Sequence, residues 1–278
     1  MILTSKGRKL DLAAPQIMGI LNVTPDSFSD GARYQHLDKA LFHAEQMIRD
    51  GASIIDIGGE STRPGADEVS LDEELYRVIP VIERFASELD VWLSVDTYKP
   101  EVMNESIRAG AHLINDICAL QEPGALSVVA ESGVPVCLMH MQGKPRTMQQ
   151  APHYNNLCGE VYAFFQERIN TALMAGIKKE QLILDPGFGF GKTLEQNYEL
   201  LGRLDHFHTL DLPLLVGMSR KSMIGQLLDR PVTERTAGSI AAALFAVQQG
   251  ASIIRVHDVK ETADALHVFM HAKAFSRH

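Results

Sequence analysis

The chain has 278 residues, of which 45% are hydrophobic and 22% charged, and its formal net charge is −9. The composition is that of a globular protein, and the negative charge argues against a nucleic-acid partner, because phosphate backbones select basic surfaces. The N-terminal residues lack the apolar core of a signal peptide, and no apolar run approaches the roughly 20 residues that span a bilayer. Three widely spaced cysteines predict neither a disulfide framework nor a zinc site. We therefore expect a cytoplasmic protein with no membrane partner.

The first predicted element is a small β-hairpin in residues 2–13, within an N-terminal segment of residues 1–15. Eight short runs rich in Ile, Val and Leu follow it. Apolar runs of this length, without alternation, are typical of buried parallel strands. The predicted strands are Gln16–Leu21, Ser53–Ile55, Val91–Val95, His112–Ile114, Val134–Met139, Gln181–Leu184, Leu212–Val216 and Ser252–Val256.

The segments between these runs carry helical periodicity, and several end at a glycine, which commonly terminates a helix. The predicted helices are Asp38–Asp50, Glu73–Glu88, Glu101–Ala109, Asn156–Ala175 and Thr236–Gln249. Eight strands alternating with helices predict a parallel sheet, and eight is the number that closes a barrel. An open, doubly wound sheet is the alternative, although it usually has fewer units.

No linker or low-complexity segment interrupts this pattern. We therefore expect residues 1–278 to form one α/β domain, a (β/α)8 TIM barrel whose amino-terminal mouth is capped by the hairpin. The Gly/Pro-rich segment Met141–His153 predicts a long loop.

Polar residues follow the predicted strands, at the end of a barrel where active sites lie. They are Asn22, Asp56, Asp96, Asn115, His140, Asp185, Lys221 and His257, with Arg255 inside the last strand. One strand-end Asp is as often structural as functional. So many charges in one mouth favour a site, because barrel interiors normally hold branched apolar side chains.

The chemistry of these residues predicts two subsites. Carboxylates and amides suit a nitrogen-rich heterocycle, because they accept from amino and ring N–H groups. Lys221, Arg255, His257 and Arg63 suit an anion such as a phosphate. Asn22 is a candidate ligand for Mg²⁺, which often takes few protein ligands together with phosphate oxygens.

Two other patterns suggest sites but do not satisfy the requirements. Gly187–Thr193 resembles a phosphate-binding loop, but Pro186 stands where the Walker pattern needs glycine, and Gly191 comes one residue early for the dinucleotide pattern. We interpret it as a strand-to-helix loop whose Phe188 and Phe190 line a pocket. His140 and His153 have no third ligand at metal spacing, so we expect no metal there.

Two polar, Gly/Pro-rich loops, Asn22–Gln35 and Gly58–Ser70, are candidate substrate lids. Gly19–Gly31 and Gly51–Gly65, which include much of these loops, resemble the two signature segments of the dihydropteroate synthase family. Further similar segments occur in family order along almost the whole chain. They are Ser94–Thr97, Ile114–Ile117, Asp185–Lys192, Gly217–Ser222 and Arg255–Asp258.

The resemblance implies condensation of 6-hydroxymethyl-7,8-dihydropterin diphosphate with 4-aminobenzoate, giving 7,8-dihydropteroate and diphosphate in folate biosynthesis. It also implies a (β/α)8 barrel, Mg²⁺ as cofactor, a homodimer, and competition by sulfonamides. The implied pterin residues are Asp56, Asp96, Asn115, Asp185 and Lys221. The implied diphosphate residues are Asn22, Arg63, Arg255 and His257, with Asn22 at the metal. The implied 4-aminobenzoate residues are Phe28, Thr62, Arg63, Pro64, Phe190 and Ser222.

We expect a dissociative, SN1-like substitution, in which carboxylates at Asp96, Asp185 and Asp30 stabilise a pterin-methylene cation. Lys221, Arg255 and His257 complete the expected catalytic set. Two alternatives are a pterin-binding methyltransferase on a similar barrel and a catalytically silent pterin-binding paralogue. The Arg63 loop and the Arg255–His257 pair disfavour the former, and the retained loop segments disfavour the latter.

Overall fold

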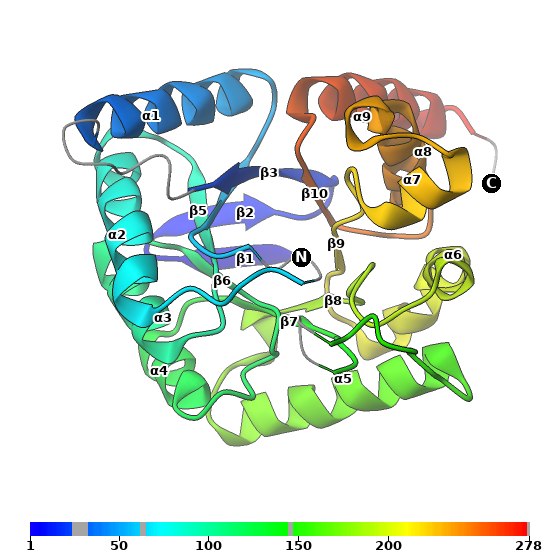
Figure 1. Ribbon diagram of the computed structural model, residues 1–278, viewed down its shortest axis with the longest axis horizontal. Helices are drawn as coiled ribbons and strands as arrows, with labels where there is room; N and C mark the ends of the chain where they lie inside the picture. The colour runs from blue at the N-terminus through cyan, green and yellow to red at the C-terminus, as the bar shows by residue number, and fades with distance from the viewer. Residues whose placement is uncertain (24–32, 62–64, 144–146, 277–278) are drawn as a thin grey trace.

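A computed structural model describes residues 1–23, 33–61, 65–143 and 147–276 of the chain. Eight parallel strands form a nearly closed barrel, as predicted, surrounded by helices (Figure 1). The strand order is β8-β7-β6-β5-β4-β3-β10-β9, and a bridge between Leu184 and Leu214 joins the two ends. The barrel strands are β3 (Gln16–Asn22), β4 (Ile54–Gly58), β5 (Trp92–Asp96), β6 (Leu113–Asp116), β7 (Val136–Met139), β8 (Leu182–Asp185), β9 (Leu215–Val216) and β10 (Ile253–Val256).

The helices between the strands include all five that the periodicity predicts, with shifted ends. The α-helices are α1 (Arg33–Arg49), α2 (Leu71–Glu88), α3 (Pro100–Ala109), α4 (Ala125–Ser132), α5 (Leu157–Met174), α6 (Leu194–Gly202), α7 (Ser222–Leu228), α8 (Thr236–Gln248) and α9 (Val259–Ala274). Short 3-10 helices are η2 (Lys179–Gln181), η3 (Leu204–Leu210) and η4 (Val232–Glu234). The described part of Met141–His153 contains no helix or strand, which agrees with the predicted loop.

Helix α2 illustrates how local sequence sets these elements. The Ser70 hydroxyl accepts a hydrogen bond from the Glu73 N–H, and Asp72, Glu73 and Glu74 place negative charge at the helix N-terminus. One face buries Val78, Val81, Ile82 and Phe85 against the barrel. The helix is therefore fixed at its start by capping and along its length by apolar burial.

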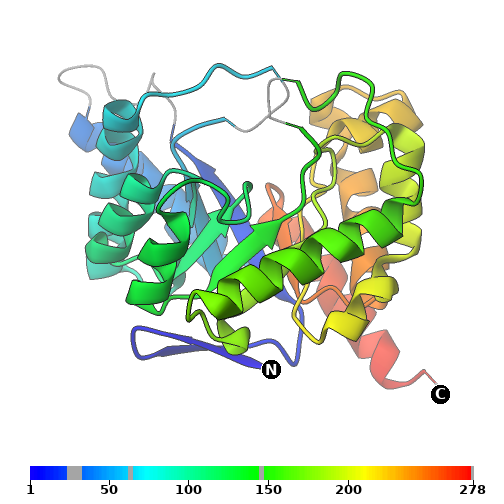
Figure 2. The same cartoon turned by 90° about the horizontal axis from the view of Figure 1, so that it is seen from below.

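The core has two layers. The larger one lies between the outer faces of the strands and the helices. The smaller one fills the floor of the barrel, with apolar side chains from each strand that include Met18, Ile54 and Trp92. Leu3 from β1 (Ile2–Ser5) and Leu10 from β2 (Arg8–Asp11) complete it, because the predicted hairpin closes this end of the barrel (Figure 2).

No helix in the described ranges is long and apolar enough to cross a membrane.

Candidate active site

The barrel interior changes from apolar to charged along each strand. Side chains two residues apart on a strand point to the same face. On β5, Trp92 lies in the apolar floor, so Ser94 and Asp96 also face inward. On β4, Asp56 follows Ile54 in the same way, and on β10 Arg255 follows Ile253. The carboxyl-terminal half of the barrel is therefore lined by polar groups, as the strand-end residues predict.

Five of these residues form one hydrogen-bonded group, which we call the Arg255 cluster: Asp56, Ser94, Asp96, Asn115 and Arg255. The Arg255 guanidinium donates from Nε to Asp56 Oδ2 at 2.6 Å and from its NH2 nitrogen to Asp96 Oδ2 at 2.8 Å. Ser94 Oγ donates to Asp56 Oδ1 at 2.6 Å, and Asn115 Nδ2 donates to Asp56 Oδ2 at 3.2 Å. Both Asp56 oxygens are thus occupied.

Asp96 differs from Asp56, although Arg255 binds both. Its Oδ1 is buried and has no hydrogen-bond partner among the described residues. Burial raises the pKa of Asp96 to about 7, against the opposing charge of Arg255. Burial alone lowers the pKa of Arg255, but the Asp56 and Asp96 carboxylates outweigh it and leave that pKa raised. The guanidinium is permanently charged, and one carboxylate oxygen in the mouth still needs a donor.

Asp185 and Lys221 form the opposite side of the mouth, which we call the Lys221 pair. Asp185 Oδ1 accepts from the Gly187 N–H at 2.8 Å, whereas Lys221 Nζ donates to the Phe188 carbonyl at 2.7 Å. Lys221 Nζ also lies 4.7 Å from the centre of the Phe190 ring. Burial raises the pKa of Asp185 and lowers that of Lys221 to about 8, while each charge opposes the shift of the other.

Asn22 and His257 lie at the edge of this mouth. Asn22 pairs in register with Gly58, which pairs with Asp96. A side-chain carbon at Gly58 would lie 3.8 Å from Asn22 Oδ1 and 3.9 Å from Asp96 Oδ2, so both oxygens flank this glycine. His257 is partly exposed, and its Nδ1 lies 3.0 Å from Ser219 Oγ. Ser222 is exposed at the first position of α7.

The structure therefore brings together most of the predicted site residues, with one unexpected arrangement. The family resemblance implies that Arg255 binds the diphosphate, yet two of its nitrogens contact the carboxylates of Asp56 and Asp96, which are implied to bind the pterin. The residues Phe28, Asp30, Thr62, Arg63 and Pro64 lie outside the described part of the chain.

Sequence reasoning missed two features of the site. Ser94 donates to Asp56, and its phase with Trp92 and Asp96 on β5 was the signal that could have identified it. An apolar wall beside the mouth contains Ile117, Met139 and Met148 together with Phe190. Of this wall, the sequence indicated only Phe190.

A TIM barrel with such a mouth defines an enzyme of small polar substrates, and residues 18–257 match the family of pterin binding enzymes. The chain is 62% identical to the dihydropteroate synthase of Escherichia coli (strain K12), over 96% of this chain and 95% of that one. A Yersinia pestis dihydropteroate synthase structure with a sulfonamide drug complex matches with a TM-score of 0.94 and 59% identity, covering 99% of this chain and 100% of that one. A Xanthomonas albilineans dihydropteroate synthase with 4-aminobenzoic acid matches at a TM-score of 0.92 and 51% identity, covering 99% of each. The chain belongs to the dihydropteroate synthase family, whose members are transferases.

Proposed function

We propose that the mouth of this barrel joins 6-hydroxymethyl-7,8-dihydropterin diphosphate to 4-aminobenzoate and releases diphosphate. Family membership supports the reaction. The observation that supports this location is the buried Asp96 Oδ1, which has no hydrogen-bond partner among the described residues. A buried acceptor without a donor is costly, and the amino and ring N–H groups of a pterin are donors.

The pterin ring contacts both sides of the mouth in this proposal. Asp96, Asn115 and Asp185 accept from or donate to its polar edge, and Lys221 donates to its acceptors. Asp56 stays in its network with Ser94 and Arg255 and orients the Asp96 carboxylate through the shared guanidinium. The apolar wall around Ile117 and Met139 suits a flat ring face.

The diphosphate lies towards Asn22 and His257 in this proposal. Arg63, in the second signature loop, and Arg255, in the last barrel strand, contribute positive charge to its binding. The residues fit Mg²⁺ as an added cofactor. Asn22 offers an amide oxygen at the edge of the mouth, and Mg²⁺ often takes only one or two protein ligands besides water and phosphate oxygens. The described residues contain no group of three His, Cys, Asp or Glu side chains that would make a dedicated metal cage. When bound, the ion would neutralise charge on the leaving diphosphate.

The 4-aminobenzoate subsite is assigned to Phe190 and Ser222, with Phe28, Thr62, Arg63 and Pro64 from the two signature loops. Phe190 is buried beneath Lys221, which places this subsite next to the pterin residues. The aromatic amine is a neutral nucleophile, so the chain needs no strong general base. Sulfonamides would compete at this subsite.

The bond to diphosphate breaks first in this mechanism, leaving a methylene cation delocalised into the pterin ring. Asp96 and Asp185 carry the negative charge that stabilises this cation, and Asp30 adds to it from the first loop. Arg255 and His257 stabilise the departing anion, while Lys221 holds the pterin ring. The amine nitrogen then attacks the methylene carbon and passes its proton to the released diphosphate, while exclusion of water protects the cation from hydrolysis.

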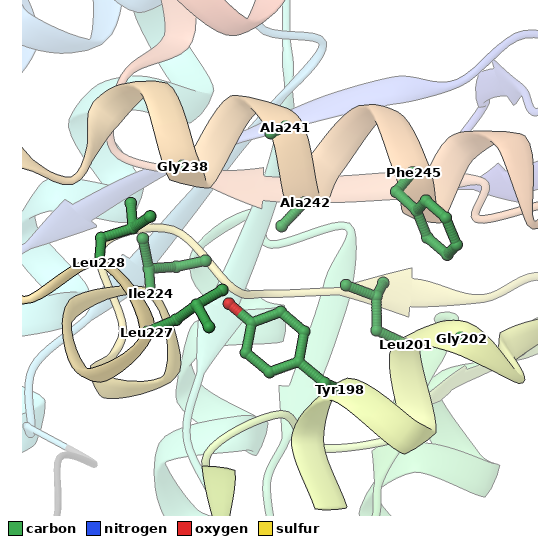
Figure 3. A pocket seen from close by; sticks show the side chains of 10 residues that line it. All are labelled: Tyr198, Leu201, Gly202, Ile224, Leu227, Leu228, Gly238, Ala241, Ala242 and Phe245. Carbon is green, nitrogen blue, oxygen red and sulfur yellow. The ribbon is translucent and has the colours of Figure 1, made fainter. Parts of the chain in front are cut away.

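We also propose that the chain forms a homodimer through the faces of α6, α7 and α8. These helices surround an apolar pocket of about 320 Å³, lined by residues that include Leu201, Ile224 and Ala242 (Figure 3). Beside the pocket, the large apolar side chains of Leu227 and Phe245 are 57% and 44% exposed. Together with the pocket they form an exposed apolar patch, which is typical of protein–protein interaction sites. A Phe245→Asp variant should be monomeric by sedimentation; a persistent dimer would exclude this face.

We propose a cytoplasmic location for the protein. The buried thiols of Cys137 and Cys158 suit that location.

One assay tests the proposed reaction. The protein is mixed with pterin diphosphate, Mg²⁺ and 4-aminobenzoate, and both diphosphate release and dihydropteroate formation are measured. Equal amounts of the two products are expected. Pterin binding without either product would identify a silent paralogue, and methyl transfer from methyltetrahydrofolate would identify a methyltransferase.

A further inference from the structure

A buried lysine lies behind the mouth and takes no part in the mechanism described above. Lys192 is 3% exposed, and its Nζ has three neighbours within hydrogen-bond distance. These are the Gly187 carbonyl at 2.9 Å, the Phe190 carbonyl at 3.1 Å and His140 Nδ1 at 3.1 Å. Burial lowers the pKa of Lys192 to about 7, while the charge of Asp185 opposes that shift. In its protonated form Lys192 has three donors and no acceptor, so the three neighbours satisfy it completely.

When Lys192 is protonated, His140 accepts from it. Its Nδ1 therefore carries a lone pair, and the ring is neutral with its proton on Nε2. Burial, with the neighbouring Lys192 charge, lowers the pKa of His140 to about 2, which agrees with a neutral ring. The ring packs edge-to-face on Phe164, with centroids 4.9 Å apart, so the imidazole is held in place independently of Lys192.

The loop from Gly187 to Gly191 depends on side chains for its conformation. All five of its carbonyls accept from side chains: Gly187 and Phe190 from Lys192, Phe188 from Lys221, Gly189 from Gln149, and Gly191 from Tyr154. Gly187 has a φ of 71°, and a side-chain carbon there would lie 1.9 Å from the His140 carbonyl oxygen. The loop backbone is thus pressed against the end of β7, and the buried ammonium links the two.

This arrangement explains the Gly-Lys-Thr sequence that resembles a phosphate-binding loop. In a phosphate-binding loop the lysine reaches the phosphate. Here Lys192 uses all its donors on the protein's own carbonyls and imidazole. The lysine organises the loop instead of binding an anion.

The loop in turn positions two residues of the proposed site. Lys192 binds the carbonyl of Phe190 directly, and the Phe190 ring lies beneath Lys221. Lys221 is oriented by its hydrogen bond to the Phe188 carbonyl. Lys192 does not bind that carbonyl, so its effect on Lys221 is indirect. A displaced loop would therefore move Phe190, which is assigned to 4-aminobenzoate, more than Lys221, which is assigned to the pterin.

We propose that Lys192 is a positioning residue, whose buried ammonium holds loop 187–191 in the conformation that places Phe190 for 4-aminobenzoate and Lys221 for the pterin. The inference rests on the proposed function of this mouth. It assigns Lys192 no contact with either substrate.

The test compares two variants of the same loop. Lys192→Met keeps most of the volume but removes every donor, whereas Tyr154→Phe removes one hydrogen bond, to the Gly191 carbonyl. Lys192→Met should raise the KM for 4-aminobenzoate about tenfold, a change worth about 1.4 kcal/mol, and raise the KM for pterin diphosphate less. Tyr154→Phe should stay within about threefold of wild type for both. Lys192→Arg, which retains charge and donors, should recover part of the loss.

Several outcomes would overturn the proposal. They are unchanged KM values in Lys192→Met, an equal effect of Tyr154→Phe, or a fall in kcat alone that follows the folded fraction measured by circular dichroism. If Lys192→Met does not fold, His140→Ala removes one acceptor and should give the same KM pattern more weakly; wild-type values would then contradict the proposal. Inactive wild-type protein would instead refute the proposed function, so the two failures are distinguishable.

Discussion

On one side of the barrel mouth Arg255 donates directly to Asp56 and Asp96, whereas on the other no hydrogen bond joins Asp185 to Lys221 within the described contacts. The Arg255 cluster therefore neutralises its buried charges internally. In the Lys221 pair, the carboxylate and the ammonium hydrogen-bond to backbone groups instead of to each other, and Lys221 also lies over the Phe190 ring. Buried charges that are paired support the fold, whereas buried charges that are not paired directly are available to a substrate.

The difference predicts that the two cations contribute to stability very unequally. Arg255→Met leaves Asp56 and Asp96 buried without their common partner, so we expect the free energy of unfolding to fall by about 3–5 kcal/mol. Lys221→Met should cost much less, because burial already disfavours that ammonium and lowers its pKa to about 8. Urea unfolding of both variants measures the contrast. Equal losses would remove the distinction between the two sides.

Asp185→Asn tests the other side of the comparison through binding. The amide can still accept from the Gly187 N–H but loses the charge that faces the pterin, which is worth roughly 1.5–3 kcal/mol per charge-assisted bond. We expect pterin affinity to fall roughly 10- to 100-fold by calorimetry. Stability should be unchanged or higher, because burial raises the pKa of Asp185 and so disfavours its charged form. Wild-type pterin affinity in this variant would remove Asp185 from the pterin site.

The sequence predicted which residues line the mouth better than it predicted how those residues hydrogen-bond to one another. Strand-end positions are visible in the sequence because a buried apolar run simply stops at Asp56, Asp96 or Asp185. The place of Arg255 was not visible. Its backbone pairs with Met18, and its side chain reaches past β3 to β4 and β5, so its partners depend on how the barrel closes.

The same limit applies to elements without a strong local signal. Helix α7 has only seven residues, and α4 is preceded by Gly124, which has no side chain to cap it, so neither carries a clear start signal. The burial of Lys192 was also hidden. Two of its three partners are backbone carbonyls whose directions depend on the left-handed glycines of the loop.

Asp96 is intermediate between the two sides of the mouth, because Arg255 binds one of its oxygens and the other has no partner in the part of the chain that the structure describes. Its pKa is about 7 in the folded protein and about 3.9 in an unfolded chain. Between these values the folded state binds more protons, so the contribution of Asp96 to stability is fully present below about pH 4 and is lost as the pH rises through 7. The stability of wild type relative to Asp96→Asn should therefore fall from pH 4 to pH 7 in urea unfolding.

Pterin affinity should change in the opposite direction, because the proposed contact needs the carboxylate. Wild-type affinity should rise by up to about tenfold in total as the pH increases from 6 to 8, because the ionised fraction of a group with a pKa of about 7 rises roughly tenfold over that range, and Asp96→Asn should show no such rise. A wild-type profile as flat as that of the variant would mean that Asp96 does not titrate in this range.

The smallest expected effect comes from a single hydroxyl of the Arg255 cluster. Ser94→Ala removes the donor to Asp56 Oδ1 and should lower the free energy of unfolding by about 1–2 kcal/mol, with a smaller loss of pterin affinity. Ser106→Ala is a matched control, because Ser106 is equally buried and its Oγ has no partner among the described residues. That variant should be neutral or slightly more stable. If Ser94→Ala were also neutral in urea unfolding, Arg255 and Asn115 alone would suffice to hold Asp56, and the cluster would be less tightly interdependent than its geometry implies.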